Sequence, residues 1–349
     1  MQINLLGYYG FHNIGDDLML QNLCTYFLNS GKVQQINVFC RHAYYSSRPG
    51  VRYYPLNRFS RLQKAFLLIK NRYTFWGGGT CIYQAENSKG LFELRRLQKI
   101  VKTFGNRFGF LGIGIGQLRD EKYISTAKKL LLDSDYNYFR DADSLQKAAS
   151  LTDRDDLLLG GDLVFLSDIT PQIHASKDIK KISFSANYNG TSQSADYYSS
   201  QLLNIINYFK CKLYFLPAHT GIDFNDNDFH HKIAEKLPAG TFHICDWKQP
   251  VDFIQKLADM DFHIGSRLHS LVLADMLGIP GIGITHSPKI KYYLQKSANI
   301  SPLRIVEPGS QILPEHIREI KNKYRVKPEF INSERLSIID CLEKILADV

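Results

Sequence analysis

Short apolar segments alternate with amphipathic segments along almost the whole chain, and this alternation strongly limits the folds that it can adopt. Candidate strands in the first half are Ile3–Leu6, Ile36–Phe39, Tyr73–Trp76, Phe108–Gly112, Tyr136–Phe139 and Leu157–Leu159. A second series follows at Ile182–Ser185, Leu213–Leu216, Phe242–Cys245, His263–Gly265 and Gly281–Ile284. Candidate helices separate these strands. The pattern predicts an α/β fold with parallel sheets that helices cover on both faces.

The two series of strands predict two domains. At 349 residues the chain is longer than one ordinary hydrophobic core supports. A polar segment without periodicity, Asp168–Lys180, separates the series. We therefore expect two doubly wound, Rossmann-like domains, residues 1–170 and 180–325, which face each other across a crevice that holds the ligand. Residues 326–349 are expected to form a helix that packs across both domains.

The composition narrows the class of protein. A hydrophobic content of 44% is typical of globular chains. No apolar run approaches the roughly 20 residues that cross a bilayer, and the chain starts on a candidate strand without the basic region of a signal peptide. The six scattered cysteines never form a C-x-x-C pair, which argues against structural zinc and favours reduced thiols. We expect a cytoplasmic protein.

The net charge of +9 is concentrated between Leu18 and Ala85. This stretch contains no Asp or Glu, whereas the 34 Lys and Arg outside it balance the 34 Asp and Glu of the chain. Its nine basic residues are Lys32, Arg41, Arg48, Arg52, Arg58, Arg61, Lys64, Lys70 and Arg72. Such a field attracts an anionic membrane, a lipid-diphosphate acceptor or nucleic acid, unless it is only a solvated face. The candidate helix Phe59–Lys70 suits either an interfacial helix or ordinary packing.

Glycine-rich turns follow the candidate strands of the first half. The first, Gly7–Asp17, contains Asn13, Gly15 and Asp16 ahead of a helix, where free N–H groups suit an anion. It is not G-x-G-x-x-G, and no acidic residue follows about 20 residues on, so a dinucleotide site is disfavoured. Asp16 either caps the helix or accepts a proton from a sugar hydroxyl. Two further turns, at Gly77–Gly79 and Gly112–Gly116, complete a predicted ligand floor to which Gly78 and Gly79 contribute.

The run Ser266-Arg267-Leu268-His269 is the sharpest motif of the second half. With Ser266 as N-cap, the next three residues would form the first helical turn, whose N–H groups and guanidinium together suit a carboxylate or phosphate. His269 adds a side chain of a type that titrates near neutrality. The alternative is a satisfied core histidine and a surface cation.

Two further residues follow strands that we expect beside this run. Lys289 comes after the next candidate strand, and adjacent parallel strands would bring it near His269. Asn187 follows the first strand of the second half and is a candidate ligand contact.

A cluster of acids and histidines resembles a metal site only superficially. Its members are Asp223, Asp226, Asp228, His230 and His231. The carboxylates precede a candidate helix, where acids complement the helix dipole, and adjacent histidines point to different faces. We therefore expect no metal.

Taken together, the motifs resemble the polysaccharide pyruvyl transferase family. The matching elements are Asn13-Ile14-Gly15-Asp16, Gly77–Gly79, Gly112–Gly116, Arg140–Ser144, Asp162 with Phe165, and Arg267-Leu268-His269 through Gly278 and Pro280 to Lys289. They appear in family order over nearly the whole chain, and the C-terminal block is the most specific of them.

The resemblance implies a two-domain fold like that of GT-B glycosyltransferases. It implies transfer of a pyruvyl group from phosphoenolpyruvate to a sugar, as a cyclic ketal, with release of phosphate. Arg267 and the Leu268 backbone would hold the donor, Lys289 would contact its charge, and His269 would be the acid or base. No cofactor is implied, and the partners are phosphoenolpyruvate and a glycan or lipid-diphosphate-linked oligosaccharide.

Two other functions stay open at this point. A GT-B glycosyltransferase of cell-envelope glycan synthesis would use Arg267 and Lys289 to bind a nucleotide-sugar diphosphate. A non-enzymatic module would use the basic stretch to bind nucleic acid or a membrane, although we expect no nucleic acid. Peripheral contact with the inner face of an anionic membrane is compatible with catalysis.

Overall fold

The computed structural model describes residues 1–84, 89–171, 178–187, 193–222, 224–301 and 303–349. These residues form two compact units. The first comprises Met1–Phe11, Asp16–Ser167 and Asn332–Val349, and the second comprises His12–Gly15 and Asp168–Ile331. Part of the expected linker, residues 172–177, lies outside the described residues. The crevice between two domains stays a prediction.

The first unit is built on a parallel sheet. Its strands are β1 (Gln2–Leu6), β2 (Gln35–Cys40), β3 (Val51–Pro55), β4 (Tyr73–Gly77), β5 (Thr80–Ile82), β6 (Arg107–Ile115), β7 (Tyr136–Phe139) and β8 (Leu158–Leu159). They lie in the order β3-β2-β1-β4-β6-β7-β8, with β5 paired to β6. The strand order therefore reverses beside β1, between β1 and β4, where doubly wound sheets bind ligands.

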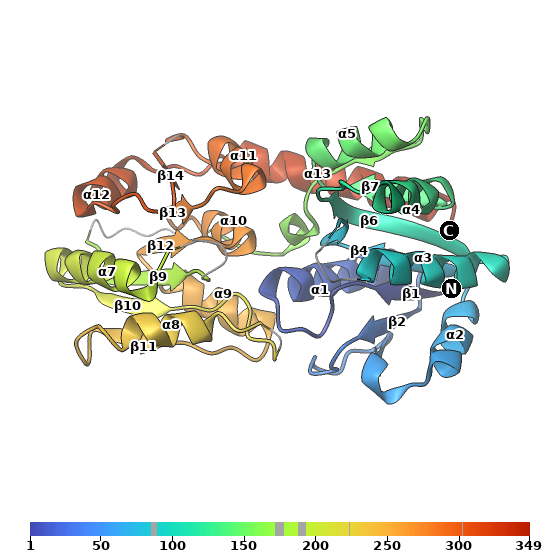
Figure 1. The fold of residues 1–349 in the computed structure, drawn as a ribbon, viewed down its shortest axis with the longest axis horizontal. Coiled ribbons are helices and arrows are strands. Elements are labelled where there is room, and N and C mark those ends of the chain that lie inside the picture. Colours follow the sequence, from blue (N-terminus) through green and yellow to red (C-terminus); the bar gives the residue numbers. More distant parts are fainter. Residues whose placement is uncertain (85–88, 172–177, 188–192, 223, 302) are drawn as a thin grey trace. The chain divides into compact units, whose positions relative to one another are not determined.

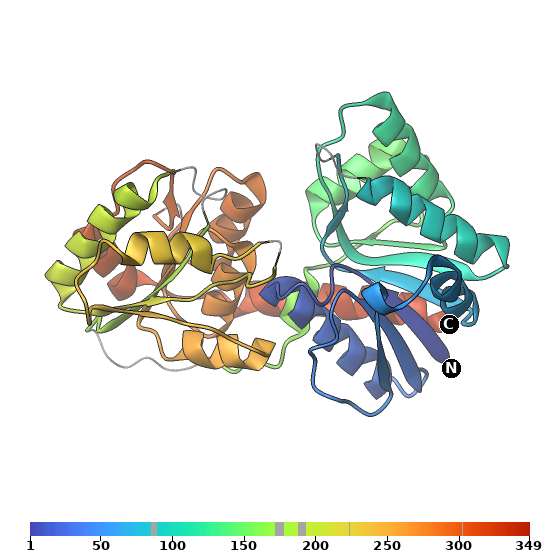
Figure 2. The same ribbon diagram turned by 60° about the horizontal axis from the view of Figure 1, so that its bottom comes forward.

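Helices cover both faces of this sheet (Figure 2). They are α1 (Ile14–Asn29), α2 (Arg61–Ile69), α3 (Gly90–Thr103), α4 (Glu121–Leu132), α5 (Ala142–Leu151) and the end of α13 (Pro328–Ala347), with short 3-10 turns at Leu56–Arg58 and Leu163–Leu166. Helices α2 to α5 contact one another in series. The last turn of α13 is tied to the turn after α1, because Lys32 Nζ donates to the Leu346 carbonyl at 2.6 Å.

The second unit repeats the same plan in six parallel strands (Figure 1). They are β9 (Lys181–Ser185), β10 (Lys212–Phe215), β11 (Phe242–Ile244), β12 (Phe262–Gly265), β13 (Gly281–Ile284) and β14 (Ile305–Val306), in the order β11-β10-β9-β12-β13-β14. The order reverses between β9 and β12. The helices are α7 (Ala195–Phe209), α8 (Asn227–Ala234), α9 (Pro250–Ala258), α10 (Leu268–Met276), α11 (Pro288–Ser297) and α12 (Pro314–Lys323).

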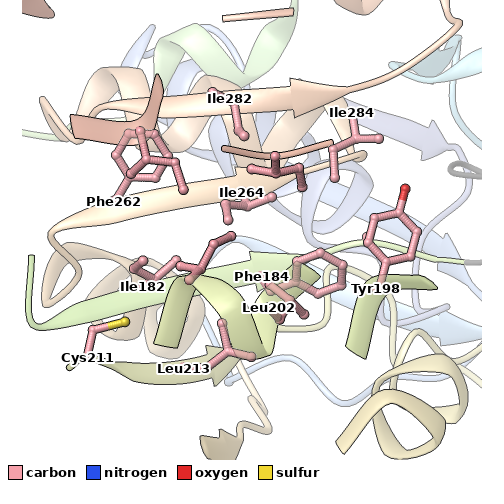
Figure 3. Close-up of a cluster of buried hydrophobic side chains, with 14 of the residues drawn as sticks. Ile182, Phe184, Tyr198, Leu202, Cys211, Leu213, Phe262, Ile264, Ile282 and Ile284 are labelled. Carbon is pink, nitrogen blue, oxygen red and sulfur yellow. The ribbon is translucent and has the colours of Figure 1, made fainter. Parts of the chain in front are cut away.

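The core of the second unit follows from the period of its strands. Helix α7 contacts α8 and α12, and α10 contacts α9 and α11, so each face of the sheet has its own layer of helices. Alternate strand residues such as Ile182 and Phe184 on β9 are buried in one cluster with Ile282 on β13, and Tyr198 and Leu202 of α7 pack in the same cluster (Figure 3). Two parallel, doubly wound sheets confirm the predicted α/β class.

A buried ion pair stabilises the second unit on the side of β13. Arg304 and Asp275 are fully buried, with Nη2 and Oδ1 2.6 Å apart. Tyr293 and Tyr324 each donate their hydroxyl to the same carboxylate at 2.8 Å. Arg304 also donates to the Gly281 carbonyl. The network therefore ties α10 and α11 to β13 and to the end of α12.

No helix formed by the described residues is both long enough and apolar enough to cross a membrane.

Candidate functional site

The strand-order reversal of the second unit brings two of the predicted loops together. Gly265 of β12 lies opposite Ser185 of β9, and the next residue, Ser266, donates its N–H to the Ser185 carbonyl at 2.9 Å. The hydroxyl of Ser266 accepts the N–H of Asn187 at 3.4 Å. Tyr188 and Asn189, which follow in the same loop, lie outside the described residues. Asn187 and Ser266 thus lie side by side at the carboxyl edge of the sheet.

The helix after β12 begins one residue later than expected. Arg267, not Ser266, is the N-cap of α10, with extended backbone angles and no side-chain cap. The prediction of a Ser266 cap is wrong because the Ser266 hydroxyl turns to the Asn187 backbone. Leu268 and His269 consequently form the start of the first helical turn. The N–H groups of a first turn have no carbonyl partner within their own helix, so this turn suits an anion.

A buried histidine holds that first turn in place. The hydroxyl of Ser270 donates to the Arg267 carbonyl at 2.9 Å and lies 3.0 Å from Nε2 of His263. Ser183 lies 2.8 Å from Nδ1 of the same ring. Burial lowers the pKa of His263 to about 3, so its ring is neutral. Because the Ser270 hydroxyl already donates to Arg267, it accepts from Nε2–H of His263. Through Ser270, His263 of β12 therefore holds the backbone at Arg267, where the candidate anion site begins.

Asp226 positions the guanidinium of Arg267. Its Oδ1 lies 2.5 Å from Nη2 of Arg267, and its Oδ2 accepts the N–H groups of Ala218 and His219, each at 3.1 Å. Nε of Arg267 is buried and has no hydrogen-bond partner in the part of the chain that the structure describes. Sequence reasoning weighed Asp226 as a metal ligand or as an acid that complements the dipole of the following helix, and it missed this role. Asp226 lies in the loop between β10 and α8, and this position after a strand was the sequence feature that could have indicated its role.

The remaining members of the acid and histidine cluster do not converge. Burial lowers the pKa of His230 to about 4, so the ring is neutral, and its Nε2 accepts the N–H of Ala186 at 3.4 Å. Asp223 lies outside the described residues. Among the described residues, no group of three or more His, Cys, Asp or Glu side chains could hold a metal ion.

A short segment from the start of the chain joins the second unit at this site. Ile14 donates its N–H to the Ala218 carbonyl and Thr220 donates to the His12 carbonyl, both at 2.9 Å. Gly15 packs against the imidazole ring of His269. A Cβ atom added to Gly15 would lie 1.8 Å from Nδ1 of His269. The contact explains why glycine occupies a helical position with an ordinary, negative φ.

Gly15→Ala should therefore displace the His269 ring without straining the backbone. Because the atoms nearest to the added methyl group belong to an imidazole, the ring can swing away, and a misplacement of about 1 Å can reduce a rate roughly 100-fold. We expect that loss in kcat for the reaction proposed below, with the Kd for its anionic substrate nearly unchanged. Steady-state kinetics and isothermal calorimetry measure the two quantities. An unchanged kcat would show that the position of His269 is unimportant.

Lys289 lies at the same edge of the sheet. β12 and β13 are in register, with Gly265 opposite Gly283. Lys289 is the second residue of α11, which begins four residues after β13 ends, and it is exposed. The structure thus brings Asn13, Gly15, Asn187, Ser266, Arg267, Leu268, His269 and Lys289 into one unit.

Ser185, which sequence reasoning did not select, lies in this unit as well. Its hydroxyl is fully buried and has no partner among the described residues. A buried polar atom of this kind needs an explanation, which a ligand or an ordered water would supply.

The other predicted residues lie in the first unit. Asp16 is buried in the first turn of α1, which Asn13 caps by accepting the N–H of Gly15 at 3.2 Å. The alternative of an Asp16 cap is therefore wrong, and a role in proton transfer stays a prediction. Gly78 and Gly79 both have positive φ, and Oδ1 of Asp16 lies 3.1 Å from where a Cβ on Gly79 would be. Asp16 and Gly79 are thus neighbours.

Asp17, beside Asp16, gives the first unit a measurable pH dependence. It accepts the hydroxyl of Tyr45 at 2.5 Å and that of Tyr44, and burial raises its pKa to about 8. Between about pH 4 and pH 8 the folded chain holds a proton that the unfolded chain has released, so the stability falls as pH rises, by up to about 1.4 kcal/mol per pH unit.

Asp17→Asn should flatten this slope, since an amide does not titrate. Urea unfolding across that pH range, followed by the fluorescence of Trp76 in a Trp247→Phe background, measures the effect on the first unit. Equal slopes for the Asp17→Asn variant and for the chain that keeps Asp17 would contradict the assignment.

The predicted glycine floor is largely filled by the protein's own side chains. A Cβ on Gly77 would lie 2.4 Å from the Tyr9 hydroxyl, which donates to the Gly77 carbonyl. Gly112 and Gly114 are not in a turn, because β6 continues to Ile115. Gly112, with positive φ, marks an irregularity in the pairing with β7 and packs against Leu163. The glycines of β4 and β6 therefore serve packing.

Arg140, from the matching element Arg140–Ser144, forms an internal ion pair. Its Nη1 lies 3.3 Å from Asp162, and its Nη2 donates to Thr80. Asp143, from the same element, pairs with Lys147.

Comparisons with known proteins give the family and the fold of the chain. A family model described as polysaccharide pyruvyl transferase matches residues 13–288. In fold, the chain is similar to UDP-GlcNAc 2-epimerase from Methanocaldococcus jannaschii in complex with UDP-GlcNAc and UDP, with 12% identity, full coverage of both chains and a TM-score of 0.63. The UDP-N-acetylglucosamine 2-epimerase from Rickettsia bellii is similar at 12% identity, with 99% of this chain and 96% of that chain covered and a TM-score of 0.62. No curated protein sequence matches.

At 12% sequence identity, these two structures show similarity of fold alone. They confirm the predicted GT-B-like fold with two Rossmann-like domains.

Proposed function

The chain belongs to the polysaccharide pyruvyl transferase family, and we propose that it transfers the pyruvyl group of phosphoenolpyruvate to a sugar. The sugar is part of a surface polysaccharide or of its lipid-linked precursor. The product is a cyclic ketal, and phosphate is released. The chain is thus a transferase that acts on a glycan, and the donor and the site residues are the parts that we propose.

The observation that carries the proposal is the anion site at the start of α10. Phosphoenolpyruvate has a carboxylate and a phosphate, so its recognition needs at least two groups of positive or N–H character. The Arg267 guanidinium, held by Asp226, and the N–H groups of the α10 first turn supply both kinds. Lys289 adds a cation from the next strand end. The imidazole of His269 lies within the same turn, where an acid is needed.

The chemistry assigns each group a step. His269 donates a proton to the methylene carbon of phosphoenolpyruvate, and a sugar hydroxyl adds to the adjacent carbon as it becomes cationic. As its C–O bond forms, that hydroxyl gives its proton to the imidazole of His269, which replaces the proton donated to carbon. A second hydroxyl of the same sugar then displaces phosphate and closes the ketal, and its proton goes to the departing phosphate. Arg267 and Lys289 stabilise the negative charge that develops on the departing phosphate. These steps need no metal or organic cofactor.

The acceptor side of the proposal rests on the first unit. Asp16 is buried beside Gly79 at the strand-order reversal of that unit, where a carboxylate can accept a hydroxyl proton. Gly79 would let the sugar approach the backbone beside this carboxylate, whereas Gly78 packs against Met19. We place the enzyme in the cytoplasm, where phosphoenolpyruvate is made and used.

Binding of the donor tests the proposal most simply. Phosphoenolpyruvate should raise the unfolding temperature of the wild-type chain, whereas UDP-sugars, which the structurally similar epimerases bind, should leave it unchanged. Arg267→Ala should weaken phosphoenolpyruvate binding roughly 10- to 100-fold, because a hydrogen bond to a charged group contributes about 1.5–3 kcal/mol. Arg267→Lys should recover only part of this, since it lacks the planar fork. Stabilisation by UDP-sugars but not by phosphoenolpyruvate would favour a glycosyltransferase instead.

A further inference from the structure

Helix α2 exposes an apolar pair that its own unit does not cover. Leu62 is 84% exposed and Phe66 is 65% exposed, and their spacing of four residues places them on one face. The helix packs through a different side, because Leu68 is 1% exposed and belongs to the core cluster of the first unit. The sequence alone left open whether the face with Leu62 and Phe66 is packed or interfacial. The structure shows that this face is turned outward.

Hydrogen bonds at both ends of α2 hold the helix in this orientation. Ser60 forms a capping box with Gln63 at its start. At its end, the Leu68 carbonyl accepts the Asn4 amide at 2.9 Å and the Ile69 carbonyl accepts the Asn106 amide at 2.7 Å. These bonds secure both ends of a short helix, and the second ties α2 to the turn after α3 (Figure 1).

That turn adds a third exposed apolar side chain, and the surroundings are basic. Phe104, two residues before Asn106, is 62% exposed. Arg58 precedes the helix, and Lys70 follows Phe66 by four residues, so exposed cations flank the apolar pair at both ends. The surrounding stretch Leu18–Ala85 contains no acidic residue. Apolar side chains framed by cations match a bilayer interface with anionic headgroups.

We propose that the α2 surface, formed by Arg58, Leu62, Phe66, Lys70 and Phe104, docks on an anionic lipid bilayer. Leu62, Phe66 and Phe104 enter the headgroup boundary, and the two cations contact lipid phosphates. A nucleic acid would pair with the cations but leave Leu62 without an apolar partner. A second copy of the same surface would place like charges against each other. The proposal does not depend on the reaction that the enzyme catalyses.

Flotation with vesicles tests the proposal on the full chain. The wild type should float with vesicles of phosphatidylcholine and phosphatidylglycerol and should stay behind with phosphatidylcholine alone. Leu62→Ser with Phe66→Ser should lower the partition coefficient roughly tenfold or more. Arg58→Glu with Lys70→Glu should lower it at least about fivefold for each charge removed. Leu336→Ser, which removes a leucine of 66% exposure on α13, is the matched control and should float like the wild type.

Equal unfolding temperatures should show that every variant is folded, since exposed substitutions change stability by only about 0.5 kcal/mol. The proposal is overturned if the wild type does not float, if it floats equally with neutral vesicles, or if the double serine variant floats like the wild type. Retention of single-stranded RNA without flotation would identify a nucleic-acid surface. If the wild type sediments as a dimer, the double serine variant sediments as a monomer and neither floats, the surface is a contact between two copies of the chain.

Discussion

His269→Gln is expected to reduce kcat for pyruvyl transfer by about 10²–10⁴, the usual contribution of a general acid. Glutamine approximates the size of the ring and keeps an N–H donor, but it cannot deliver a proton to carbon. The affinity for phosphoenolpyruvate should change little, because we assign donor binding to Arg267 and the first-turn N–H groups. Phosphate release in the presence of acceptor measures kcat, and calorimetry measures the Kd. The two together separate proton transfer from binding.

The chain offers a matched control for this substitution. His286 follows β13 at the same edge of the sheet, but it is exposed and pairs with Glu307 at 3.1 Å. His286→Gln should leave kcat within about threefold of the wild type, as expected of a residue outside the reaction. If His269→Gln behaved like His286→Gln, the proton donor would have to be sought elsewhere.

Arg304→Met is expected to destabilise the second unit by about 3–5 kcal/mol, since it leaves the Asp275 carboxylate buried without its cation. Both side chains are fully buried, so solvent cannot compensate for the loss. Trp247, which is buried in the second unit, can report this unfolding in a Trp76→Phe background. Arg318→Met provides the control, because Arg318 is exposed and packs over the aromatic ring of Tyr208.

The double variant Asp275→Leu with Arg304→Met separates the two parts of that loss. Removing both charges should recover part of the stability, because no isolated charge remains. Recovery should be incomplete, since the hydroxyls of Tyr293 and Tyr324 lose their acceptor. A single Arg304→Met variant as stable as the Arg318→Met control would show that the buried pair contributes little.

Much of the fold could be predicted because strand period and helix period report burial directly. The structure has β7 at Tyr136–Phe139 and β13 at Gly281–Ile284, with the predicted bounds. β3 and β14 were not predicted. β14 has only two residues, and β3 carries polar and aromatic residues that are only partly buried. Their pairing depends on a neighbouring strand, which local sequence does not reveal.

The strand ends that carry the candidate site could be predicted, but most contacts between their residues could not. The run Ser266–His269 lies where strand succession placed it. The partners that position it come from distant loops, namely Asp226 for Arg267 and Gly15 for His269. Gly15 was selected as part of a glycine turn, and its contact with the imidazole follows from residues 12–15 joining the second unit. Ser266 was misassigned as a cap because the backbone of Asn187 competes for its hydroxyl.

Mass spectrometry of glycans after incubation with isotopically labelled phosphoenolpyruvate tests the proposed reaction most directly. Lipid-linked and synthetic glycans serve as acceptors, and released phosphate is measured in parallel. We predict that a glycan gains the labelled pyruvyl group as a ketal, that one phosphate is released for each group transferred, and that Arg267→Ala and His269→Gln slow both to the same extent. Transfer of a sugar from a nucleotide donor to the same glycans, with the label remaining in phosphoenolpyruvate, would contradict the proposal.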